Sequence, residues 1–386
     1  MKIGINTLFF KYPASGSGQY LLHLLRALTE VDQENQYILL SPYPMPQKSG
    51  FLTRFQYLET PLPAFAAGNE RLEKLIGEQF TAPSAARKAG VDLFHIPYFG
   101  PPFFPRRPVV ITIHDVIPLR LPDYRTRVTM KAYLQLIAHA AHNATLIITV
   151  SQHARQDMME ALKLPSERIR VINEAAGDEY QPITDAPRLA GMRTRYGLNE
   201  RYILYLGGLD QRKNVPQLVR AFAHLYGQMH DPDLQLLIAG NPDQQTGPLF
   251  PDPRPLASNL GMTDQIIYRF IEEEDKPAVY SGASVFVFPS LYEGFGLTPL
   301  EAMSCGTPVI CSNRTSLPEV VGDAAISLDP ENLHEMVEAM HSVLTNSELR
   351  ADLRARSLQR AALFSWRKTA IETVAAYKEA FARSKH

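Results

Sequence analysis

Residues 288–310 read FPSLYEGFGLTPLEAMSCGTPVI. An apolar run ends, a loop with two glycines follows, and a helical pattern comes next. Thr298 at the N-cap, Pro299 in the first turn and Glu301 three residues after the cap predict a capping box. Gly306 suits the left-handed position that ends a helix. The stretch therefore predicts a strand, loop and helix of a parallel sheet.

The same alternation extends to both sides of this unit. Short, continuous apolar runs rich in β-branched residues are typical of parallel strands that are buried on both faces. Regular alternation of such runs with amphipathic stretches predicts an α/β fold of doubly wound parallel sheets. The predicted strands are Ile3–Leu8, Tyr37–Leu40, Leu93–Ile96, Val109–His114, Leu146–Val150, Arg170–Ile172, Tyr202–Leu206, Leu234–Ala239, Ile266–Phe270, Val285–Phe288, Val309–Cys311 and Ala325–Leu328, and the helices include Gln19–Leu28, Val215–Tyr226 and Leu333–Leu344.

The chain length and a break in the pattern predict two domains. A chain of 386 residues is too long for one ordinary core. The alternation loosens at residues 174–187, where a glycine and two prolines interrupt a polar segment. We expect Rossmann-like domains at residues 1–175 and 176–365 that face a central cleft, and a helix over residues 366–386 that packs back towards the N-terminal domain. Ligands of such sheets lie at the carboxyl ends of the strands, so the loops there should form the site.

Composition excludes several classes of protein. A formal net charge of −1 provides no basic field for nucleic acid. Two cysteines, Cys305 and Cys311, are too few for a disulfide framework, and they have too few neighbouring ligands for a zinc site. The sequence shows neither a signal-peptide pattern nor a run of about 18 apolar residues. We therefore expect a reduced, cytoplasmic setting without a metal site.

The loop before the helix has the properties of an anion site. It places backbone N–H groups at the positive end of a helix dipole, directly after a strand. Gly294 and Gly296 let the backbone approach an anion closely. These features predict a site for a diphosphate.

The spacing of several motifs resembles one enzyme family. Glu293 and Glu301 lie eight positions apart, and Gly-Phe-Gly follows the first of them. Together with the motifs below, this pattern resembles the retaining family 4 glycosyltransferases of the GT-B fold, above all the mannosyltransferase-B branch, which builds bacterial surface polysaccharides from GDP-mannose. The resemblance covers nearly the whole chain. The further motifs are GTPVI at 306–310, SLPEVVGDAA at 316–325, LGGLDQRKN at 206–214, HDVIPL at 114–119 and TVS at 149–151.

The resemblance implies roles for the residues after the strand that ends at Phe288. Glu293 would hold hydroxyls of the donor sugar, and Glu301 would hold the ribose hydroxyls. A solvated loop acid is the alternative for Glu293, and a capping-box residue alone is the alternative for Glu301. Backbone N–H groups from Phe295 to Thr298 would bind the phosphates. The donor-binding residues implied in this part of the chain are Glu293, Gly294, Phe295, Gly296, Leu297, Thr298 and Glu301.

Two cations follow the strand that ends at Leu206. Lys213 and Arg212 can neutralise a leaving diphosphate as its negative charge develops. An exposed basic turn is the alternative. Many members of the family carry arginine where this chain has Gly208, and Arg212 could supply that charge. The family generally uses no metal for this task, and the motifs contain no Asp-x-Asp triplet, so we expect no cofactor or metal.

The N-terminal half contains the remaining candidates. The resemblance places His114 beside the transferring sugar, whereas a core histidine at a strand end is the alternative. Two interpretations stay open for His95: contact with the acceptor and a position in the core. Two also stay open for Ser151: a site residue and a helix N-cap. Gly16 and Gly18 open a helix after the first strand, where the family uses the loop backbone against the donor phosphate.

One stretch suits a lipid surface. Residues 99–107 read FGPPFFPRR, and aromatic and cationic groups are favoured at a membrane interface. These residues predict contact with a lipid-linked acceptor or with the membrane surface. A proline-rich loop packed on the domain is the alternative.

The expected reaction is transfer of a hexose, mannose from GDP-mannose in the first instance, to a hydroxyl of a saccharide or lipid-linked acceptor with retention of configuration. No carboxylate is placed as the nucleophile of a retaining glycosidase would be. A UDP-sugar donor and a catalytically silent nucleotide-sugar-binding protein are alternatives. An epimerase would leave the two-glutamate motif unexplained, and a phosphorylase would bind pyridoxal phosphate.

Overall fold

The computed structural model describes residues 1–13, 15–45, 50–66, 68–125, 128–240, 243 and 247–385. Contacts divide the chain into two compact units. Unit 1 comprises Met1–Glu174 and Ser365–His386, and unit 2 comprises Ala175–Phe364.

The described residues of unit 1 form a sheet of seven parallel strands. Its central strands carry side chains with no exposed surface, such as Ile5, Ile111 and Ile147. Such strands need helices on both faces, which the sheet has. In spatial order the strands are β3 (Gln56–Glu59), β2 (Gln36–Ser41), β1 (Lys2–Asn6), β4 (Leu93–Ile96), β5 (Val109–Ile113), β6 (Leu146–Thr149) and β7 (Ile169–Val171).

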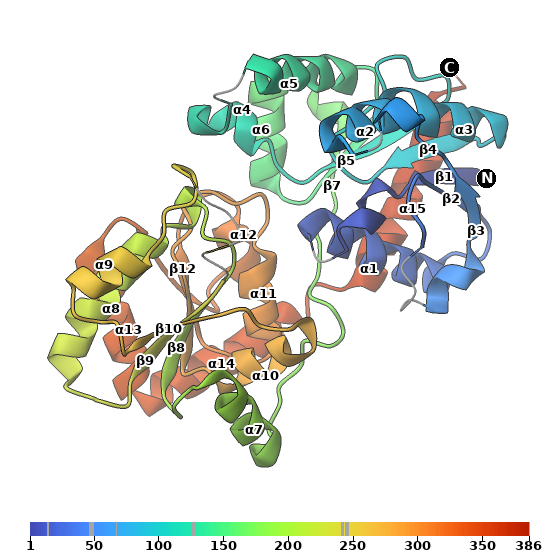
Figure 1. The fold of residues 1–386 in the computed structure, drawn as a ribbon. Coiled ribbons are helices and arrows are strands. Elements are labelled where there is room, and N and C mark those ends of the chain that lie inside the picture. Colours follow the sequence, from blue (N-terminus) through green and yellow to red (C-terminus); the bar gives the residue numbers. More distant parts are fainter. Residues whose placement is uncertain are drawn as a thin grey trace. The chain divides into compact units, whose positions relative to one another are not determined.

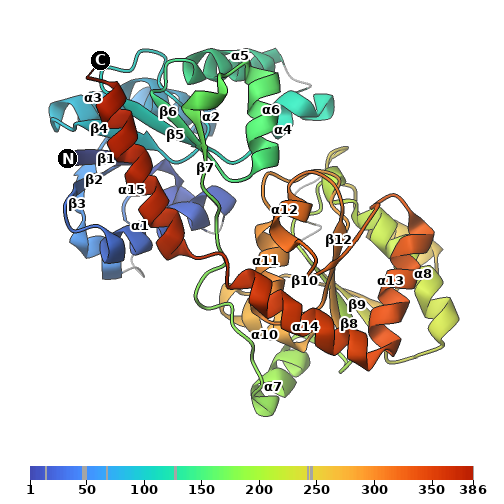
Figure 2. The ribbon, with the colours of Figure 1, turned by 180° about the vertical axis from the view of Figure 1, so that it is seen from behind.

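Two helices from opposite ends of the chain pack together on one face of this sheet. Helix α1 lies beside α15, and α15 also contacts β4, β5 and β6 (Figure 2). Polar contacts fasten α15 to the rest of unit 1; among them, the Thr369 hydroxyl donates to the Asn173 carbonyl at 2.7 Å, and Glu379 accepts from both Nε and an Nη of Arg170 at 3.0 and 2.6 Å. The α-helices of unit 1 are α1 (Gly16–Val31), α2 (Glu70–Ile76), α3 (Ala82–Lys88), α4 (Ile117–Arg120), α5 (Val128–Ala141), α6 (Gln152–Leu162) and α15 (Trp366–Arg383).

Short helical turns connect these elements. A 3₁₀ turn, η1, follows β1 directly, and the π-helical turn η4 links α2 to α3. The short turns of unit 1 are η1 (Leu8–Lys11), η2 (Gly50–Arg54), η3 (Ala64–Ala66), η4 (Gly77–Thr81), η5 (Pro122–Arg125) and η6 (Ser166–Arg168).

The described residues of unit 2 form a sheet of six parallel strands, again covered on both faces. Helices α8 and α13 pack together on one side, and α10, α11 and α14 lie on the other (Figure 1). In spatial order the strands are β10 (Ile266–Arg269), β9 (Gln235–Ala239), β8 (Tyr202–Leu206), β11 (Val285–Phe288), β12 (Val309–Ser312) and β13 (Ile326–Leu328). The helices are α7 (Ala186–Tyr196), η7 (Gln211–Lys213), α8 (Val215–Met229), α9 (Arg254–Asn259), η8 (Glu273–Asp275), α10 (Lys276–Gly282), α11 (Leu297–Ser304), α12 (Leu317–Val321), α13 (Leu333–Thr345) and α14 (Ser347–Ala361).

Each sheet reverses its strand order once. In unit 1 the reversal lies between β1 and β4, and in unit 2 it lies between β8 and β11. Connections leave such a pair of strands in opposite directions, which opens a crevice at the carboxyl ends of the pair. The loops after β8 and β11 lie at the carboxyl edge of unit 2, where this rule places a ligand.

The predicted α/β class is confirmed, with small corrections to the elements. Ile3–Leu8 is too long for the first strand, because the Leu8 N–H bonds to the Asn6 side chain at 2.9 Å and the chain turns into η1. Helix α1 begins three residues before the predicted Gln19, because the Ser15 hydroxyl caps it by accepting from the Gly18 N–H. Strand β3 was not predicted, because it is a short edge strand without β-branched residues.

Candidate functional site

A tight turn after β8 presents the two candidate cations of unit 2. Arg212 and Lys213 lie in η7, and the Asp210 carboxylate accepts from the Arg212 N–H at 3.0 Å. Asn214 adopts a left-handed φ of 57°, and its side-chain amide donates to the Pro330 carbonyl at 2.8 Å. These contacts fix the turn, so that both basic side chains start from an ordered backbone.

The two cations converge on Glu293, which lies in the loop after β11. One carboxylate oxygen, Oε1 of Glu293, lies 2.5 Å from the Lys213 ammonium and 3.0 Å from an Nη of Arg212. The Ser290 hydroxyl donates to the same oxygen at 2.6 Å. The side chains of Lys213 and Glu293 are only 11 and 12% exposed. The loops after β8 and β11 thus bring these three charged residues together, and Glu293 is not a solvated loop acid.

Burial and charge have opposite effects on the Glu293 carboxyl. Burial alone would raise its pKa, but the adjacent Lys213 and Arg212 cations outweigh burial and lower the pKa below its usual value. The carboxylate is therefore ionised at neutral pH. A carboxylate held by two cations and a hydroxyl is a poor nucleophile, and its ionic partners orient it for hydrogen bonding.

The segment before α12 holds the backbone around Glu293. The Thr315 hydroxyl accepts from the Glu293 N–H at 3.1 Å. The Ser316 hydroxyl lies 3.0 Å from the Glu293 carbonyl and 2.6 Å from the Phe295 carbonyl. Ser316 is the first residue of the motif at 316–325, for which the sequence predicts no role. Its contacts show that it supports the glycine loop.

Helix α11 begins two residues earlier than the capping box requires. It starts at Leu297, and Gly296 is its N-cap with φ 127° and no side-chain cap. Because Thr298 already lies inside the helix, it cannot act as the N-cap, and the predicted capping box is wrong. A Cβ at Gly296 would lie 2.9 Å from Leu317 Cδ2, so both the backbone angle and the close approach require glycine. Gly306, with φ 72°, follows the helix as predicted.

The Glu301 side chain bonds to Tyr280 and not to the backbone of the predicted helix cap. The Tyr280 hydroxyl donates to Glu301 Oε2 at 2.8 Å, from helix α10. Burial raises the pKa of the Glu301 carboxyl to about 7, although Lys276 and the Tyr280 hydroxyl oppose the rise. The reading of Glu301 as a capping residue alone is therefore wrong. Its carboxyl is half-buried, and it can accept hydrogen bonds from a ligand once it is ionised.

In unit 1, His114 follows β5 and is held by a carboxylate. Its Nδ1 lies 2.7 Å from Glu174 Oε1, its Nε2 lies 3.4 Å from the Pro97 carbonyl, and the Tyr20 ring meets it edge-on at 4.7 Å. Burial would lower the pKa of His114, but the hydrogen bond and charge of Glu174 raise it above the usual value. The Glu174 carboxylate therefore fixes the orientation of this imidazole, a role that was not predicted from the sequence.

His95 and Ser151 have structural partners. His95 has no exposed surface, and its two ring nitrogens lie 2.9 Å from the Thr112 hydroxyl and 2.7 Å from the Tyr377 hydroxyl. Burial lowers the pKa of His95 to about 3, so the ring stays neutral. Ser151 is the N-cap of α6, where its hydroxyl accepts from the Ala154 N–H at 3.0 Å. His95 thus occupies the core rather than an acceptor surface.

Gly16 and Gly18 lie in the first turn of α1, directly after the loop that follows β1. A Cβ at Gly18 would lie 2.2 Å from the Tyr12 carbonyl oxygen, whereas one at Gly16 would meet no atom within 4 Å. Steric exclusion by the Tyr12 carbonyl therefore requires glycine at position 18. At position 16, glycine leaves the surface open at the start of the helix.

The aromatic stretch at 99–107 is partly packed and partly exposed. The Phe103 ring stacks on His139 at 5.1 Å, and its N–H donates to Gln79 at 2.7 Å. Phe104 is 79% exposed. The stretch is thus anchored on unit 1 and presents one large aromatic side chain to its surroundings.

Glu174, Tyr280 and Ser290 bond to candidate side chains and were not predicted from the sequence. Glu174 follows β7 at the same sheet edge as His114, and that position was a usable signal. The other two could not be found from spacing, because their contacts depend on how α10 and the loop after β11 fold. Among the described residues, no group of three or more His, Cys, Asp or Glu side chains is placed to hold a metal ion. Within the same residues, no helix has both the length and the apolar character needed to cross a membrane.

Comparison with known proteins defines the class. Residues 14–175 match the family described as Glycosyltransferase Family 4, and residues 193–360 match Glycosyl transferases group 1. In an alignment of 404 positions, the chain is also 30% identical to the O-antigen chain mannosyltransferase B of Escherichia coli. The alignment covers 98% of this chain and 100% of that protein. The chain therefore belongs to the family 4 glycosyltransferases, and it resembles the mannosyltransferase-B branch as predicted.

Solved structures show the same fold. Sucrose-phosphate synthase from Thermosynechococcus elongatus aligns with a TM-score of 0.78 at 21% identity over 99% of both chains. HepE from Anabaena, determined in complex with UDP-glucose, aligns with a TM-score of 0.75 at 16% identity over 98% of this chain and 100% of that one. The predicted GT-B fold is confirmed.

Proposed function

We propose that this glycosyltransferase moves mannose from GDP-mannose to a hydroxyl of a saccharide or lipid-linked acceptor, with retention of configuration and without a metal ion. The name of the relative that aligns over the whole chain supports mannose as the sugar and a surface polysaccharide as the product. The observation that carries the proposal is the convergence of Lys213 and Arg212 on Glu293 at the strand-order reversal of unit 2.

In the proposed reaction the bond between the sugar C1 and the diphosphate oxygen breaks, and a bond from the acceptor oxygen to C1 forms on the same face. The acceptor proton passes to the departing phosphate oxygen, and the nucleoside diphosphate leaves. Lys213 and Arg212 would stabilise the charge that develops on this leaving group. They also supply the positive charge that a metal ion would otherwise provide.

The other site residues would bind and orient the donor. The backbone N–H groups of Phe295 to Thr298, at the N-terminus of α11, would bind phosphate, with Gly294 and Gly296 permitting close approach. Glu293 would accept from hydroxyls of the sugar, and Glu301 from those of the ribose.

Unit 1 would contribute the remaining donor contacts. His114, fixed by Glu174, would donate to a sugar hydroxyl. The backbone of Gly16 and Gly18 at the start of α1 would lie against the donor phosphate. Exposed Phe104 supports contact of this unit with a lipid-linked acceptor at a membrane surface.

The transfer reaction tests this proposal directly. The purified protein is incubated with GDP-mannose, UDP-glucose or ADP-glucose and a mannoside acceptor, in EDTA and in Mg²⁺. We expect GDP-mannose to be consumed in EDTA and the product to have the α configuration of the donor, as read from the anomeric NMR couplings. A β-linked product would contradict retention, and turnover only in Mg²⁺ would contradict the metal-free mechanism.

A UDP-sugar is the second candidate donor. The structure of HepE with UDP-glucose supports it, because a protein of the same fold binds that nucleotide sugar. Turnover of UDP-glucose but not of GDP-mannose in the same assay would establish this alternative. Binding of a nucleotide sugar without any turnover would point to a catalytically silent binding protein.

A further inference from the structure

One strained residue lies beside the glycine loop of unit 2. Among the residues that the structure describes, four other than glycine have a positive φ. Lys163, Asn214 and His230 each lie at the C-cap of a helix, where the left-handed conformation is common. Thr315, with φ 58°, lies in the connection between β12 and α12 and is the only β-branched residue of the four. A β-branched side chain makes this conformation an outlier, so the strain at Thr315 needs a cause.

Contacts on both sides hold the backbone of Thr315 in this conformation. Before it, the Arg314 N–H donates to the Ser312 hydroxyl at 3.1 Å. After it, Leu317 has no exposed surface and packs against the start of α11, where a Cβ at Gly296 would lie 2.9 Å from Leu317 Cδ2. The chain is therefore fixed at both ends of the turn, and such fixed surroundings are what allow a strained residue to persist.

The strained turn holds the backbone of Glu293 by both of its polar groups. The Thr315 hydroxyl accepts from the Glu293 N–H at 3.1 Å, and the Ser316 hydroxyl lies 3.0 Å from the Glu293 carbonyl. These two bonds restrict the rotation of the Glu293 backbone. Because the Cα–Cβ bond moves with the backbone, they also fix the direction in which the side chain leaves it.

The Glu293 carboxylate depends on this direction, because one of its oxygens meets several partners. Oε1 lies 2.5 Å from the Lys213 ammonium, 3.0 Å from an Nη of Arg212 and 2.6 Å from the Ser290 hydroxyl. A rotation of the Glu293 backbone would move this oxygen away from at least one of them. In an enzyme site, a displacement of about 1 Å can lower the rate about 100-fold.

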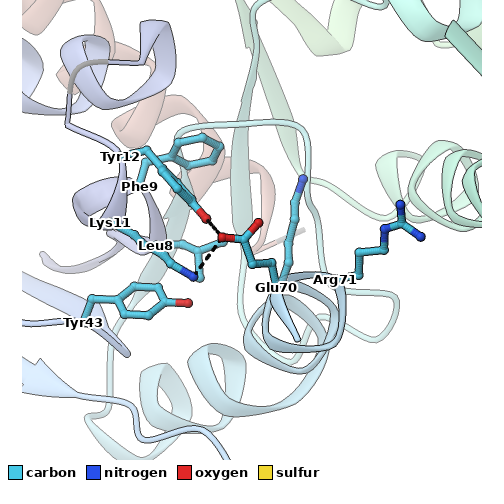
Figure 3. Close-up of a pocket in the computed structure, with 8 residues that line it drawn as sticks. Leu8, Phe9, Lys11, Tyr12, Tyr43, Glu70 and Arg71 are labelled. Carbon is cyan, nitrogen blue, oxygen red and sulfur yellow. Dashed lines mark hydrogen bonds and ion pairs between the residues drawn. The ribbon is translucent and has the colours of Figure 1, made fainter. Parts of the chain in front are cut away.

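Strain of this kind does not accompany every contact between loops at the carboxyl edge of a sheet. In unit 1, the Tyr12 hydroxyl donates to Glu70 Oε1 at 2.5 Å and joins the turn after β1 to helix α2 (Figure 3). Tyr12 has an ordinary φ of −130°. The strain at Thr315 is therefore a property of the turn that holds Glu293 and not of loop contact in general.

We infer that Thr315 is a positioning residue for the transfer reaction, whose strained backbone places the hydroxyl that keeps Glu293 in reach of Lys213 and Arg212. The inference rests on the proposed function in taking Glu293 to bind the donor sugar. It makes the hydroxyl the functional group of Thr315, and the strain a consequence of where that hydroxyl has to lie.

Three substitutions separate the hydroxyl from the strain. Thr315→Ser keeps the hydroxyl, Thr315→Val keeps the β-branched shape without it, and Thr315→Gly removes both. The matched control is Thr194→Val, at an exposed position on α7 where the hydroxyl donates to the Ala190 carbonyl of the same helix.

Hydrogen exchange of the Glu293 amide, measured on the full chain without a ligand, tests the hold on the backbone. We expect exchange to be about tenfold faster in Thr315→Val and Thr315→Gly, because both variants remove the acceptor of this N–H. Exchange in Thr315→Ser and in the control should match the wild type. This readout is independent of any nucleotide sugar.

Steady-state transfer from GDP-mannose tests the positioning role. In Thr315→Val and Thr315→Gly, kcat should fall about tenfold while the KM for the donor changes less than about twofold, because the proposed phosphate and ribose contacts do not involve Glu293. Thr315→Ser should keep the wild-type kcat. Thr315→Gly should have a higher Tm than Thr315→Val, since glycine adopts a positive φ without strain. If Thr315 had only a structural role, kcat would instead follow the order of the Tm values.

Three results would overturn the inference. They are a wild-type kcat in Thr315→Val, a loss of kcat in Thr315→Ser as large as that in Thr315→Val, and exchange of the Glu293 amide that no variant changes. If exchange behaves as expected but the wild type turns over no nucleotide sugar, the hold of Thr315 on Glu293 stands and the proposed function fails. If the wild type transfers mannose and Thr315→Val does so equally well, the proposed function stands and the inference fails.

Discussion

The Lys213 ammonium lies 2.5 Å from Glu293 Oε1, in an ion pair that joins the loops after β8 and β11. Arg212 reaches the same oxygen, so two cations share one carboxylate. A second anion, such as a diphosphate, could therefore enter without leaving either cation unpaired or the carboxylate without a partner. This arrangement suits a site that binds an anion and stabilises further negative charge as it develops on that anion.

Lys213→Met should lower kcat/KM for transfer by at least about 100-fold, which corresponds to about 2.7 kcal/mol of transition-state stabilisation. The fold should tolerate the change, because Arg212 and Ser290 still bond to Glu293. Steady-state kinetics with saturating acceptor measure the effect. Arg220→Met, at an exposed position on α8, is the control. Equal losses in both variants would contradict the role of Lys213.

Gly296→Ala should destabilise unit 2 by roughly 2 kcal/mol and weaken nucleotide binding. Its φ of 127° is unfavourable for alanine, and the new Cβ would approach Leu317 to 2.9 Å. Gly227→Ala in the interior of α8, where a Cβ meets no atom within 4 Å, should instead stabilise by roughly 0.5–1 kcal/mol. Urea unfolding of both variants gives the comparison, and a Gly296→Ala protein as stable as the wild type would show that the loop can relax.

The fold and part of the site could be predicted from sequence, for physical reasons that differ between residues. Buried strands such as Val285–Phe288 reveal themselves by continuous apolar runs, and they agree with the structure. The rule that ligands bind at the carboxyl ends of parallel strands singled out the loops of Lys213 and Glu293, and the structure places these two side chains 2.5 Å apart.

What the sequence could not predict depends on tertiary contacts. The partner of Glu301 is Tyr280, on a helix 21 positions earlier in the chain, and no local pattern links the two residues. The start of α11 was misplaced, because Thr298 has the right residue type for a cap but the glycine before the helix provides the turn. His95 followed the same pattern as His114, and only burial between Thr112 and Tyr377 separates their roles.

Glu174→Gln should lower the pKa of His114, because the variant removes the carboxylate that opposes the effect of burial. The folded pKa is raised, so the pair stabilises the protein fully below the unfolded pKa of about 6.5, and this stability is lost as pH rises through the folded value. The variant should therefore lose more stability at pH 6 than at pH 9.

NMR titration of the imidazole and thermal unfolding at the two pH values test this effect. Glu167→Gln, an exposed change in the same unit, is the control. In the transfer reaction, Glu174→Gln should shift the pH profile, whereas a purely structural role would lower activity equally at all pH values.

Glu301→Gln should increase stability at alkaline pH and abolish donor binding. The wild-type carboxyl has a folded pKa of about 7 against 4.5 when unfolded, so the folded state loses stability as pH rises from 4.5 to 7 and is constant above that range. Removing the ionisable group should add on the order of 2 kcal/mol at pH 8 and nothing at pH 4.

The affinity for the donor has the opposite pH dependence. Only the ionised carboxylate can accept from both ribose hydroxyls, so wild-type affinity should rise between pH 6 and pH 8. Scanning calorimetry and titration calorimetry at these pH values measure both effects. A variant that binds the donor as tightly as the wild type would remove Glu301 from the site.

Thermal shift with nucleotides tests the central claim, a metal-free donor site in unit 2, most directly. Wild type, Glu301→Ala and the exposed control Glu348→Ala are each heated with GDP-mannose, UDP-glucose, ADP-glucose and the free diphosphates, in EDTA and in Mg²⁺. We predict that GDP and GDP-mannose raise the Tm in EDTA by about 5 °C at saturating concentration, that Glu301→Ala loses the shift and that Glu348→Ala keeps it. No shift with any nucleotide, or a shift only in Mg²⁺, would contradict the claim.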